Sequence, residues 1–388
     1  MFPQRSSAST GFHIFLSPIK NESRLLKEAA SSLKHGVVDQ IVIVGIGEEF
    51  DTEYQQLGDH IFVWRMQLKT RQWPKNFVFQ FLKYIEWTTR IVFYESCYQT
   101  VFVHAHSLAA LPVGVLLKLM RSNPLVYDAH ELETESTENK SVFWKNLSRF
   151  AERLFIRFAD VVFVVSASIR DWYERTYKHQ SVLLLTNAPY FTVVSKSDIY
   201  RLKYGIANTS VIYLYQGGLT PGRGIRTLLS VFSSLNDDRF HMVFMGYGPL
   251  QNEIVEASKQ YATIHFHEAV SPEPKILLSH TSAADCGVFI FDKSVLSYNY
   301  SMPNKVFEYI MAGLPVIVTD GVELTKLVQQ NDIGYTVKGE NKESIMECIK
   351  NISLDQLREM TNRVASIRET YCWEKNEELL ITTYKRIM

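Results

Sequence analysis

Residues 298–320 read YNYSMPNKVFEYIMAGLPVIVTD, a pattern that predicts a loop, a helix, a turn and a short buried strand. Pro303 suits the first helical turn, where its missing N–H leaves no hydrogen bond unmade. Ser301, just before it, is expected to accept a hydrogen bond from an unpaired N–H at the helix start. Gly313 suits the helix end, and Pro315 prevents the helix from continuing.

The start of this helix has the chemistry of an anion site. A helix N-terminus carries about half a positive charge and several unpaired N–H groups. Lys305 adds a cation in the first turn, where a lysine destabilises the helix itself, so we interpret it as a ligand for an anion. Glu308 lies one turn beyond Asn304 on the same face, where a carboxylate would hold sugar hydroxyls. The alternative is an ordinary helix with Lys305 in solvent.

This stretch resembles the donor-binding signature of retaining glycosyltransferases of family 4, which have the GT-B fold. In that signature two glutamates are separated by seven residues. Glu308 stands at the second position, and the resemblance implies that it holds the nucleotide ribose while the helix start holds the diphosphate. Tyr300 stands at the first position, so the contact with the donor sugar departs from the family pattern. The donor-binding residues implied in this stretch are Tyr300, Ser301, Pro303, Asn304, Lys305, Val306 and Glu308.

A glycine-rich loop follows the first strand of the second half. Glycines let the backbone approach a phosphate closely, and Arg223 offers a forked donor to it. The loop resembles the family's second donor motif, in which an Arg and a Lys flank the diphosphate. Arg223 takes the Lys position, and Gly218 stands where the other cation is usual. The resemblance places Gly217 and Gly218 in the donor site, with Gly246 and Tyr247 of a later strand-to-helix turn.

The first half opens with a strand, a helix and a strand, which predicts a parallel sheet. These elements are expected at residues 12–16, 24–34 and 41–44. The segment around Asn21 and Arg24 resembles the first loop and helix of the family, where the loop faces the acceptor. The resemblance implies that both residues bind the acceptor. A solvated helix start is the alternative for Arg24.

Two further strands end in histidines. Residues 101–106 end at His106, and His130 lies at the end of the strand-like run 125–131. Ligands of open α/β sheets bind at the carboxyl ends of strands, so both histidines are expected to border a cleft, His106 on the acceptor side. His130 stands at the family's acceptor-side histidine, which implies that it orients the sugar or the acceptor. A structural histidine is the alternative, and His104 is expected to face the other side of its strand.

Residues 64–98 are dense in aromatic side chains interleaved with Lys and Arg, and a helix is expected at about 74–93. Aromatic and basic residues together suit a membrane surface. Core packing is the alternative. A membrane surface, at the inner face of the plasma membrane, is therefore one candidate partner of this stretch.

Composition bounds the remaining choices. The chain has 388 residues, 46% hydrophobic and 21% charged, which suits a globular protein of more than one domain. A net charge of +0 indicates no nucleic-acid partner. Four widely separated cysteines form neither a zinc motif nor a disulfide framework, which fits a reducing cytoplasm. The first ten residues lack the apolar core of a signal peptide, and no apolar run is long enough to span a membrane.

We therefore expect an α/β protein of the GT-B type, with two doubly wound Rossmann-like domains facing a cleft. Residues 1–190 would form the acceptor-binding domain and residues 207–372 the domain that binds the nucleotide-sugar donor. Residues 373–388 form an amphipathic helix that would return to pack on the first domain.

The resemblance implies a retaining glycosyltransferase that moves a sugar from a UDP or GDP sugar to a glycan or lipid-linked acceptor. Its expected role is assembly of a cell-surface polysaccharide such as lipopolysaccharide or capsule, in the cytoplasm. Arg223 and Lys305 would stabilise the departing diphosphate and His130 would complete the catalytic set. No Asp, Glu or His cluster has metal spacing, so neither a metal nor a cofactor is expected. The alternatives are a non-catalytic nucleotide-sugar-binding subunit of a polysaccharide assembly complex, and a sugar-nucleotide epimerase.

Overall fold

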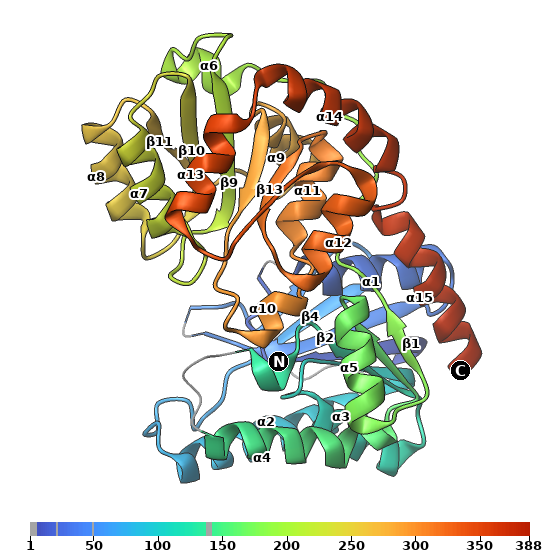
Figure 1. Cartoon of the computed structure of the whole chain (residues 1–388). Coiled ribbons are helices and arrows are strands. Elements are labelled where there is room, and N and C mark those ends of the chain that lie inside the picture. Colours follow the sequence, from blue (N-terminus) through green and yellow to red (C-terminus); the bar gives the residue numbers. More distant parts are fainter. Residues whose placement is uncertain (1–5, 21, 49, 137–141) are drawn as a thin grey trace. The chain divides into compact units, whose positions relative to one another are not determined.

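The computed structural model describes residues 6–20, 22–48, 50–136 and 142–388. Its contacts divide the chain into two compact units. Unit 1 consists of Met1–Leu185 and Glu377–Met388, and unit 2 consists of Thr186–Asn376. Each unit is built on a largely parallel sheet with helices packed against it, which confirms the predicted pair of Rossmann-like domains (Figure 1).

The sheet of unit 1 has the strand order β3-β4-β2-β1-β5-β6-β7-β8, and only β3 runs antiparallel to its neighbour. Its strands are β1 (Ser6–Phe15), β2 (Gln40–Ile46), β3 (Tyr54–Gln56), β4 (Ile61–Met66), β5 (Tyr98–His106), β6 (Leu125–Ala129), β7 (Val161–Val164) and β8 (Val182–Leu184). The helices between them are α1 (Ser23–Lys34), α2 (Phe77–Glu95), α3 (Leu111–Arg121), α4 (Val142–Phe155) and α5 (Ala167–Tyr177), with 3₁₀ turns η1 (Glu133–Glu135) and η2 (Ile156–Phe158).

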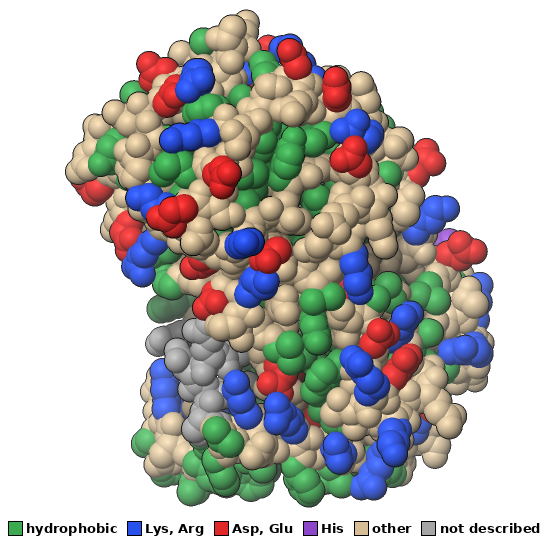
Figure 2. Space-filling view, viewed as in Figure 1, with side chains coloured by type: hydrophobic (Ala, Val, Ile, Leu, Met, Phe, Trp, Pro, Cys, Tyr) green, Lys and Arg blue, Asp and Glu red, His purple; other side chains and the backbone are tan. Residues whose placement is uncertain are grey.

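The two faces of this sheet are covered by different helices. Gly114 of α3 lies over Ala105 of β5, because a Cβ on Gly114 would sit 3.2 Å from the Ala105 Cβ. His104, the neighbouring residue, points to the opposite face and bonds Tyr384 of the C-terminal helix α15 (Trp373–Ile387). The return of the chain's last helix to the first domain is thereby confirmed. Figure 2 shows hydrophobic side chains along the edge where α2 and α4 lie in Figure 1.

Two predicted boundaries in unit 1 differ from the structure. β1 begins at Ser6 rather than near Phe12, because the backbone of its polar first half pairs with β5, while its ladder with β2 begins at Thr10. α2 begins at Phe77 rather than Pro74, since the Asn76 side chain accepts a hydrogen bond from the Phe79 N–H at 3.1 Å and caps the helix.

The sheet of unit 2 has the order β11-β10-β9-β12-β13-β14, with all strands parallel. Its strands are β9 (Val211–Gly218), β10 (Phe240–Tyr247), β11 (Ile264–Glu268), β12 (Cys286–Phe289), β13 (Val316–Thr319) and β14 (Gly334–Val337). Its helices are α6 (Ile199–Tyr204), α7 (Ile225–Leu235), α8 (Gln251–Gln260), α9 (Pro274–Thr281), α10 (Leu296–Tyr300), α11 (Asn304–Ala312), α12 (Val322–Asn331), α13 (Lys342–Asn351) and α14 (Leu354–Ile367).

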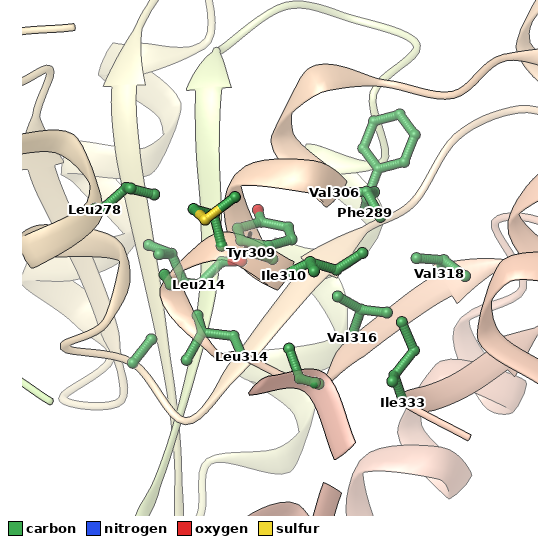
Figure 3. Close-up of a cluster of buried hydrophobic side chains, with 14 of the residues drawn as sticks. Leu214, Leu278, Phe289, Val306, Tyr309, Ile310, Leu314, Val316, Val318 and Ile333 are labelled. Atoms are coloured by element: carbon green, nitrogen blue, oxygen red, sulfur yellow. Dashed lines mark hydrogen bonds between the residues drawn. The ribbon is translucent and has the colours of Figure 1, made fainter. Parts of the chain in front are cut away.

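Helix α11 is locked against the middle of this sheet by Tyr309 (Figure 3). The Tyr309 hydroxyl accepts from the Gln216 N–H at 3.2 Å and lies 3.1 Å from the Leu214 carbonyl oxygen. A Cβ on Gly287 of β12 would lie 2.4 Å from the Tyr309 ring, so only glycine leaves room for it. These contacts of Tyr309 therefore fix the position of α11 relative to β9 and β12.

The stretch that decides the fold forms α10, α11 and β13. The end of α11 at Gly313, with φ 84°, agrees with the predicted turn. At the start, Pro303 is the residue before α11 rather than its first helical residue. The expected role of Ser301 is wrong, because its hydroxyl donates to the Tyr298 carbonyl oxygen at 2.9 Å and ends α10 instead. No side chain caps α11.

Candidate functional site

In unit 2, the carboxyl ends of β9 and β10 lie beside the start of α11. Gly217 and Gly246 are partners in the ladder, and a Cβ on Gly246 would sit 1.9 Å from the Gly217 carbonyl oxygen. Gly217 has φ 109°, a conformation that L side chains rarely adopt. A Cβ on Gly217 would lie 3.4 Å from Lys305 Nζ. At this edge of the sheet, the backbone of Gly217 therefore faces the Lys305 ammonium with no side chain between them.

Lys305 itself is half-buried above two aromatic rings. Its Nζ lies 4.1 Å from the centroid of the Tyr215 ring and 5.1 Å from that of Phe289. Within the described part of the chain the ammonium forms no ion pair. The two aromatic rings stabilise its charge through cation–π interactions instead. Burial, together with the nearby cation of Arg223, lowers the Lys305 pKa to about 7, while Glu308 opposes the shift. An anionic ligand would stabilise such a charge.

Arg223 is the second cation of this edge and lies in the loop between β9 and α7. Its Cζ is 5.5 Å from the centroid of the Tyr298 ring on α10. No carboxylate among the described residues pairs with it, and it acts electrostatically on Lys305. The loop between β9 and α7 and the α10–α11 corner thus bring two unpaired cations to one place, as expected for a site that binds a diphosphate.

Glu308 is oriented by a residue that the motif does not contain. The Gln216 side-chain amide donates to the Glu308 carboxylate, and its oxygen accepts from the Thr281 hydroxyl at 2.8 Å. Gln216 is buried at the end of β9, directly before the glycine pair. The signal available in the sequence was a glutamine at the end of an otherwise apolar strand, and the sequence analysis missed it.

The other predicted donor residues surround this edge. Gly218 pairs with Tyr247 in the ladder, and the Tyr247 side chain is exposed. Tyr300 is half-buried and ends α10, next to Ser301 and Pro303, and Asn304 is exposed in the first turn of α11. The Val306 side chain is buried in the core and its N–H donates to the Pro303 carbonyl oxygen at 3.0 Å. Val306 therefore supports the fold of the site rather than offering a side chain to a ligand.

In unit 1, His130 is the outer end of a buried network. It follows β6, and its side chain is 22% exposed. Its Nε2 lies 3.0 Å from Asp128 Oδ2 and 3.1 Å from His106 Nδ1. Behind it, His106 Nε2 lies 2.9 Å from His13 Nδ1. Contacts within hydrogen-bonding distance therefore link His130, which is partly exposed, through His106 to His13 in the interior of the unit.

His104 belongs to the same network, so its predicted orientation is wrong. Its ring stacks on that of His106 with centroids 4.2 Å apart. Side chains two residues apart on a strand point to the same face, which is the physical reason. Its Nδ1 lies 2.6 Å from the Tyr384 hydroxyl of α15.

The acceptor contacts predicted for Arg24 and His106 do not agree with the structure. Arg24 is buried, its Nε donates to Asp128 at 2.7 Å, and its Nη1 donates to the Leu185 carbonyl oxygen. His106 is fully buried behind His130. Neither side chain is available to an acceptor. Asn21 lies outside the described residues.

The charges of this network are matched inside the unit. Burial raises the pKa of Asp128 by itself, but Arg24 and His130 hold it well below the ordinary value. Burial and the charge of Asp128 raise the pKa of Glu28 well above its ordinary value. Burial also lowers the pKa of His106, to about 4, with further effects from its neighbours. The Asp128 carboxylate therefore balances Arg24, and Glu28 and His106 favour their neutral forms.

Four of these side chains lie close enough to share a metal ion: His13, Glu28, His104 and His106. Sequence spacing could not reveal this set, because it comes from β1, α1 and β5. Three histidines and a carboxylate are a donor set that zinc accepts. Arg24, with its Nε 3.1 Å from Glu28 Oε1, already supplies positive charge there. The absence of a bound metal stays a prediction.

A cavity of about 460 Å³ opens at the carboxyl ends of β1, β2 and β4. Its lining combines apolar side chains with cations: Leu16, Ile46, Leu68, Arg71, Lys75, Gln80, Lys83, Tyr84 and Trp87. The Lys83 ammonium donates to the Trp73 carbonyl oxygen at 2.7 Å. In the described ranges, Arg71 and Lys75 form no ion pair. This cavity suits a ligand with both an anionic and an apolar part.

Two family models match the chain. The Glycosyl transferase 4-like domain matches residues 24–184, and Glycosyl transferases group 1 matches residues 210–355. The chain belongs to the family-4 glycosyltransferases with the GT-B fold. In this glycosyltransferase, the second match contains both the glycine-rich loop and the start of α11.

Known relatives agree on the fold. Glucosyltransferase 3 of Streptococcus parasanguinis is 28% identical over 95 residues, which span 24% of this chain and 28% of that protein. Sucrose-phosphate synthase of Thermosynechococcus elongatus superposes with a TM-score of 0.80 at 16% identity, over 98% of this chain and 99% of that chain. HepE of Anabaena, solved with UDP-glucose, has a TM-score of 0.72 at 15% identity, over 98% and 100%.

Proposed function

We propose that this glycosyltransferase moves a hexose from a nucleotide-diphosphate sugar to a glycan or lipid-linked acceptor, with retention at the anomeric carbon. The observation that carries the proposal is Lys305. Its ammonium stands beside bare glycine backbone at an uncapped helix start, with no ion pair in the described residues. An anionic leaving group bound there would restore the charge balance.

The chemistry follows from those cations. The bond between the anomeric carbon and the diphosphate oxygen breaks, and negative charge develops on the departing diphosphate. The acceptor hydroxyl forms the new bond on the same face, and its proton passes to the leaving phosphate oxygen. Arg223, Lys305 and the start of α11 would stabilise the developing charge, and Glu308 would hold the ribose. Two side-chain cations match a diphosphate without a resident metal or cofactor.

The nucleotide is proposed to be UDP. HepE was solved with UDP-glucose, and another structural neighbour, described as trehalose-6-phosphate from E. coli, was solved with UDP-2-fluoro glucose. These ligands support a uracil nucleotide as the donor to test before GDP sugars. Tyr300, where the family pattern has a Glu, would contact the sugar through a neutral hydroxyl.

The acceptor is proposed to bind unit 1, with His130 orienting its hydroxyl. The cavity near Arg71 and Lys75 would take an acceptor that carries a phosphate beside an apolar part, which a lipid-linked sugar does. WaaG, a structural neighbour described as a glycosyltransferase involved in lipopolysaccharide biosynthesis, supports a role in polysaccharide assembly.

Isothermal titration of UDP and of uridine tests the donor site. Lys305→Met is expected to weaken UDP binding by roughly 1.5–3 kcal/mol, the usual contribution of a hydrogen bond to a charged group, and to leave uridine nearly unchanged. Lys259→Met, an exposed lysine on α8, is the matched control and should bind like the wild type. Equal losses for UDP and uridine would refute the assignment of Lys305 to the diphosphate.

A further inference from the structure

One surface of unit 1 has no place in the proposed reaction. The outward side of α2, α3 and α4 carries large apolar side chains that water can reach: Phe77, Val78, Phe81, Leu82, Ile85, Phe93, Leu116, Leu119, Met120, Val142, Phe143, Trp144, Leu147 and Phe150. We call this set the apolar face. We propose that the apolar face docks on the surface of an anionic phospholipid bilayer.

The apolar face is continuous across the helices. α3 contacts both α2 and α4, and the Phe77 and Trp144 rings have centroids 5.6 Å apart. Figure 2 shows hydrophobic side chains gathered along this edge, with Lys and Arg among them. Patches of this extent are uncommon on proteins that make no contact there and mark interaction surfaces.

Helical spacing directs these side chains away from the sheet. On α2, Phe77, Phe81 and Ile85 follow each other at intervals of four, whereas Trp87 and Ile91 are buried on the other side. A helix on the surface of a domain normally carries polar residues on its outer side. α2 is apolar on both sides, so its outer side is adapted to a second apolar environment.

α4 repeats the arrangement and adds the charge. Phe143, Leu147 and Phe150 are exposed at intervals of four and three, while Glu152 is buried and bonded to Tyr127. Its cations, Lys145, Arg149 and Arg153, stand between these apolar residues. Glu152 is the one acidic residue that the structure shows in α4.

The exposed charge of the whole surface is positive. Its cations are Lys83, Arg90, Lys118, Arg121, Lys145, Arg149 and Arg153, of which Arg90, Lys118, Arg121 and Arg149 each pair with a carboxylate. Of the acidic residues described in α2 and α4, Glu95 and Glu152 are buried, and Glu86 accepts from Lys69 and Thr70 and pairs with Arg90. Among the described residues, Lys83, Lys145 and Arg153 form no ion pair, so the surface carries more cations than the carboxylates that pair with them. Such a surface complements anionic lipid headgroups.

This combination favours a bilayer over a second copy of the chain. Protein interfaces are depleted in lysine, whereas helices lying on a membrane combine Lys and Arg with Trp, Phe and Leu. Within the described residues no helix has the length and hydropathy needed to cross a bilayer, so contact would be from one side. Exposed apolar residues of unit 2, such as Leu202 on α6, are scattered singly instead.

The structure also relocates the membrane surface that the sequence suggested. Trp64 and Trp87 of the aromatic–basic stretch are buried in the core of unit 1. The exposed part is one side of α2, and α4 completes it from a distant part of the sequence. Docking on a bilayer can be tested separately from the proposed sugar transfer, because the vesicles contain neither donor nor acceptor.

Flotation of the full chain with lipid vesicles is the experiment. At low salt, the wild type is expected to float with vesicles of phosphatidylcholine and phosphatidylglycerol, and weakly with phosphatidylcholine alone. Phe81→Ser combined with Phe143→Ser should lower the partition coefficient roughly a hundredfold, as two large apolar side chains no longer enter the bilayer. Lys145→Gln with Arg153→Gln should lower it roughly thirtyfold, on anionic vesicles alone.

Leu202→Ser is the matched control, because this leucine is at least as exposed but lies in unit 2. It should float like the wild type. UDP binding and circular dichroism verify that each variant is folded. Flotation of the Phe81→Ser, Phe143→Ser variant at the wild-type level would overturn the proposal. So would a wild type that never floats but forms a dimer that these substitutions dissociate.

Discussion

The two units treat their buried charges in opposite ways. In unit 1, Arg24 is bonded to Asp128 and lies beside Glu28, and its neighbouring histidines have pKa values lowered by burial. In unit 2, Lys305 and Arg223 share an edge of the sheet and form no ion pair among the residues that the structure describes. Both sets hold cations out of water, but only the first set supplies its own anion.

This difference separates a network that holds a fold from one that awaits a ligand. A buried charge needs a partner, and where the protein supplies it, removing that partner costs stability. Where the protein supplies only ring faces and a second cation, we propose that the missing partner is the substrate. The two arrangements therefore predict opposite effects on stability when a buried cation is replaced in unit 1 and in unit 2.

Arg24→Met should produce the largest effect, and it should be on stability. Breaking this buried ion pair leaves the Asp128 carboxylate without its guanidinium partner, which costs roughly 3–5 kcal/mol. Chemical denaturation of the variant measures it. Lys305→Met, by contrast, should keep or raise the stability of the ligand-free protein, because it removes an unpaired cation. A destabilised Lys305→Met beside an unaffected Arg24→Met would break the comparison.

The pH dependence of UDP affinity should give the next largest effect. Lys305 has a pKa of about 7 without ligand, and a bound diphosphate raises it, so binding takes up a proton above pH 7. Affinity should therefore fall as pH rises, by roughly tenfold between about pH 7 and about pH 8.5. Titration calorimetry in buffers of different ionisation enthalpy detects the proton.

Lys305→Met is the control for that profile, because it has no group to titrate in this range. Its UDP affinity should be lower and nearly flat with pH. A wild-type profile that is equally flat would show that Lys305 keeps its proton in the free protein.

The same contrast explains what the sequence could predict. The donor edge comes from two short contiguous motifs, around Arg223 and around Lys305, so the spacing of its residues was visible. The buried network is assembled from β1, α1, β5 and β6, and its partners lie far apart in the chain. The orientation of His104 was predictable from strand geometry and was nonetheless missed. The apolar side of α4, and the hydrogen bond by which Ser301 ends α10 instead of capping α11, became apparent only once neighbouring elements were in place.

Tyr300 should give the smallest effect and sharpens the comparison within unit 2. It ends α10 beside the cations, half-buried, and in the described chain no partner bonds its hydroxyl. Its phenol hydroxyl can donate one hydrogen bond to a sugar but, unlike the Glu of the family pattern, supplies no carboxylate. Tyr300→Phe should therefore change turnover or the preference between UDP-glucose and UDP-galactose by roughly two- to tenfold, the range of one neutral hydrogen bond, with UDP affinity unchanged. Glu308→Ala should do the reverse and weaken UDP first, because the Gln216 amide holds its carboxylate at this edge, where it would bind the ribose. Initial rates with both sugars and titration of UDP distinguish the two variants. If Tyr300→Phe matches the wild type in both rates, the ring only shapes the α10–α11 corner and the sugar contact is wrong.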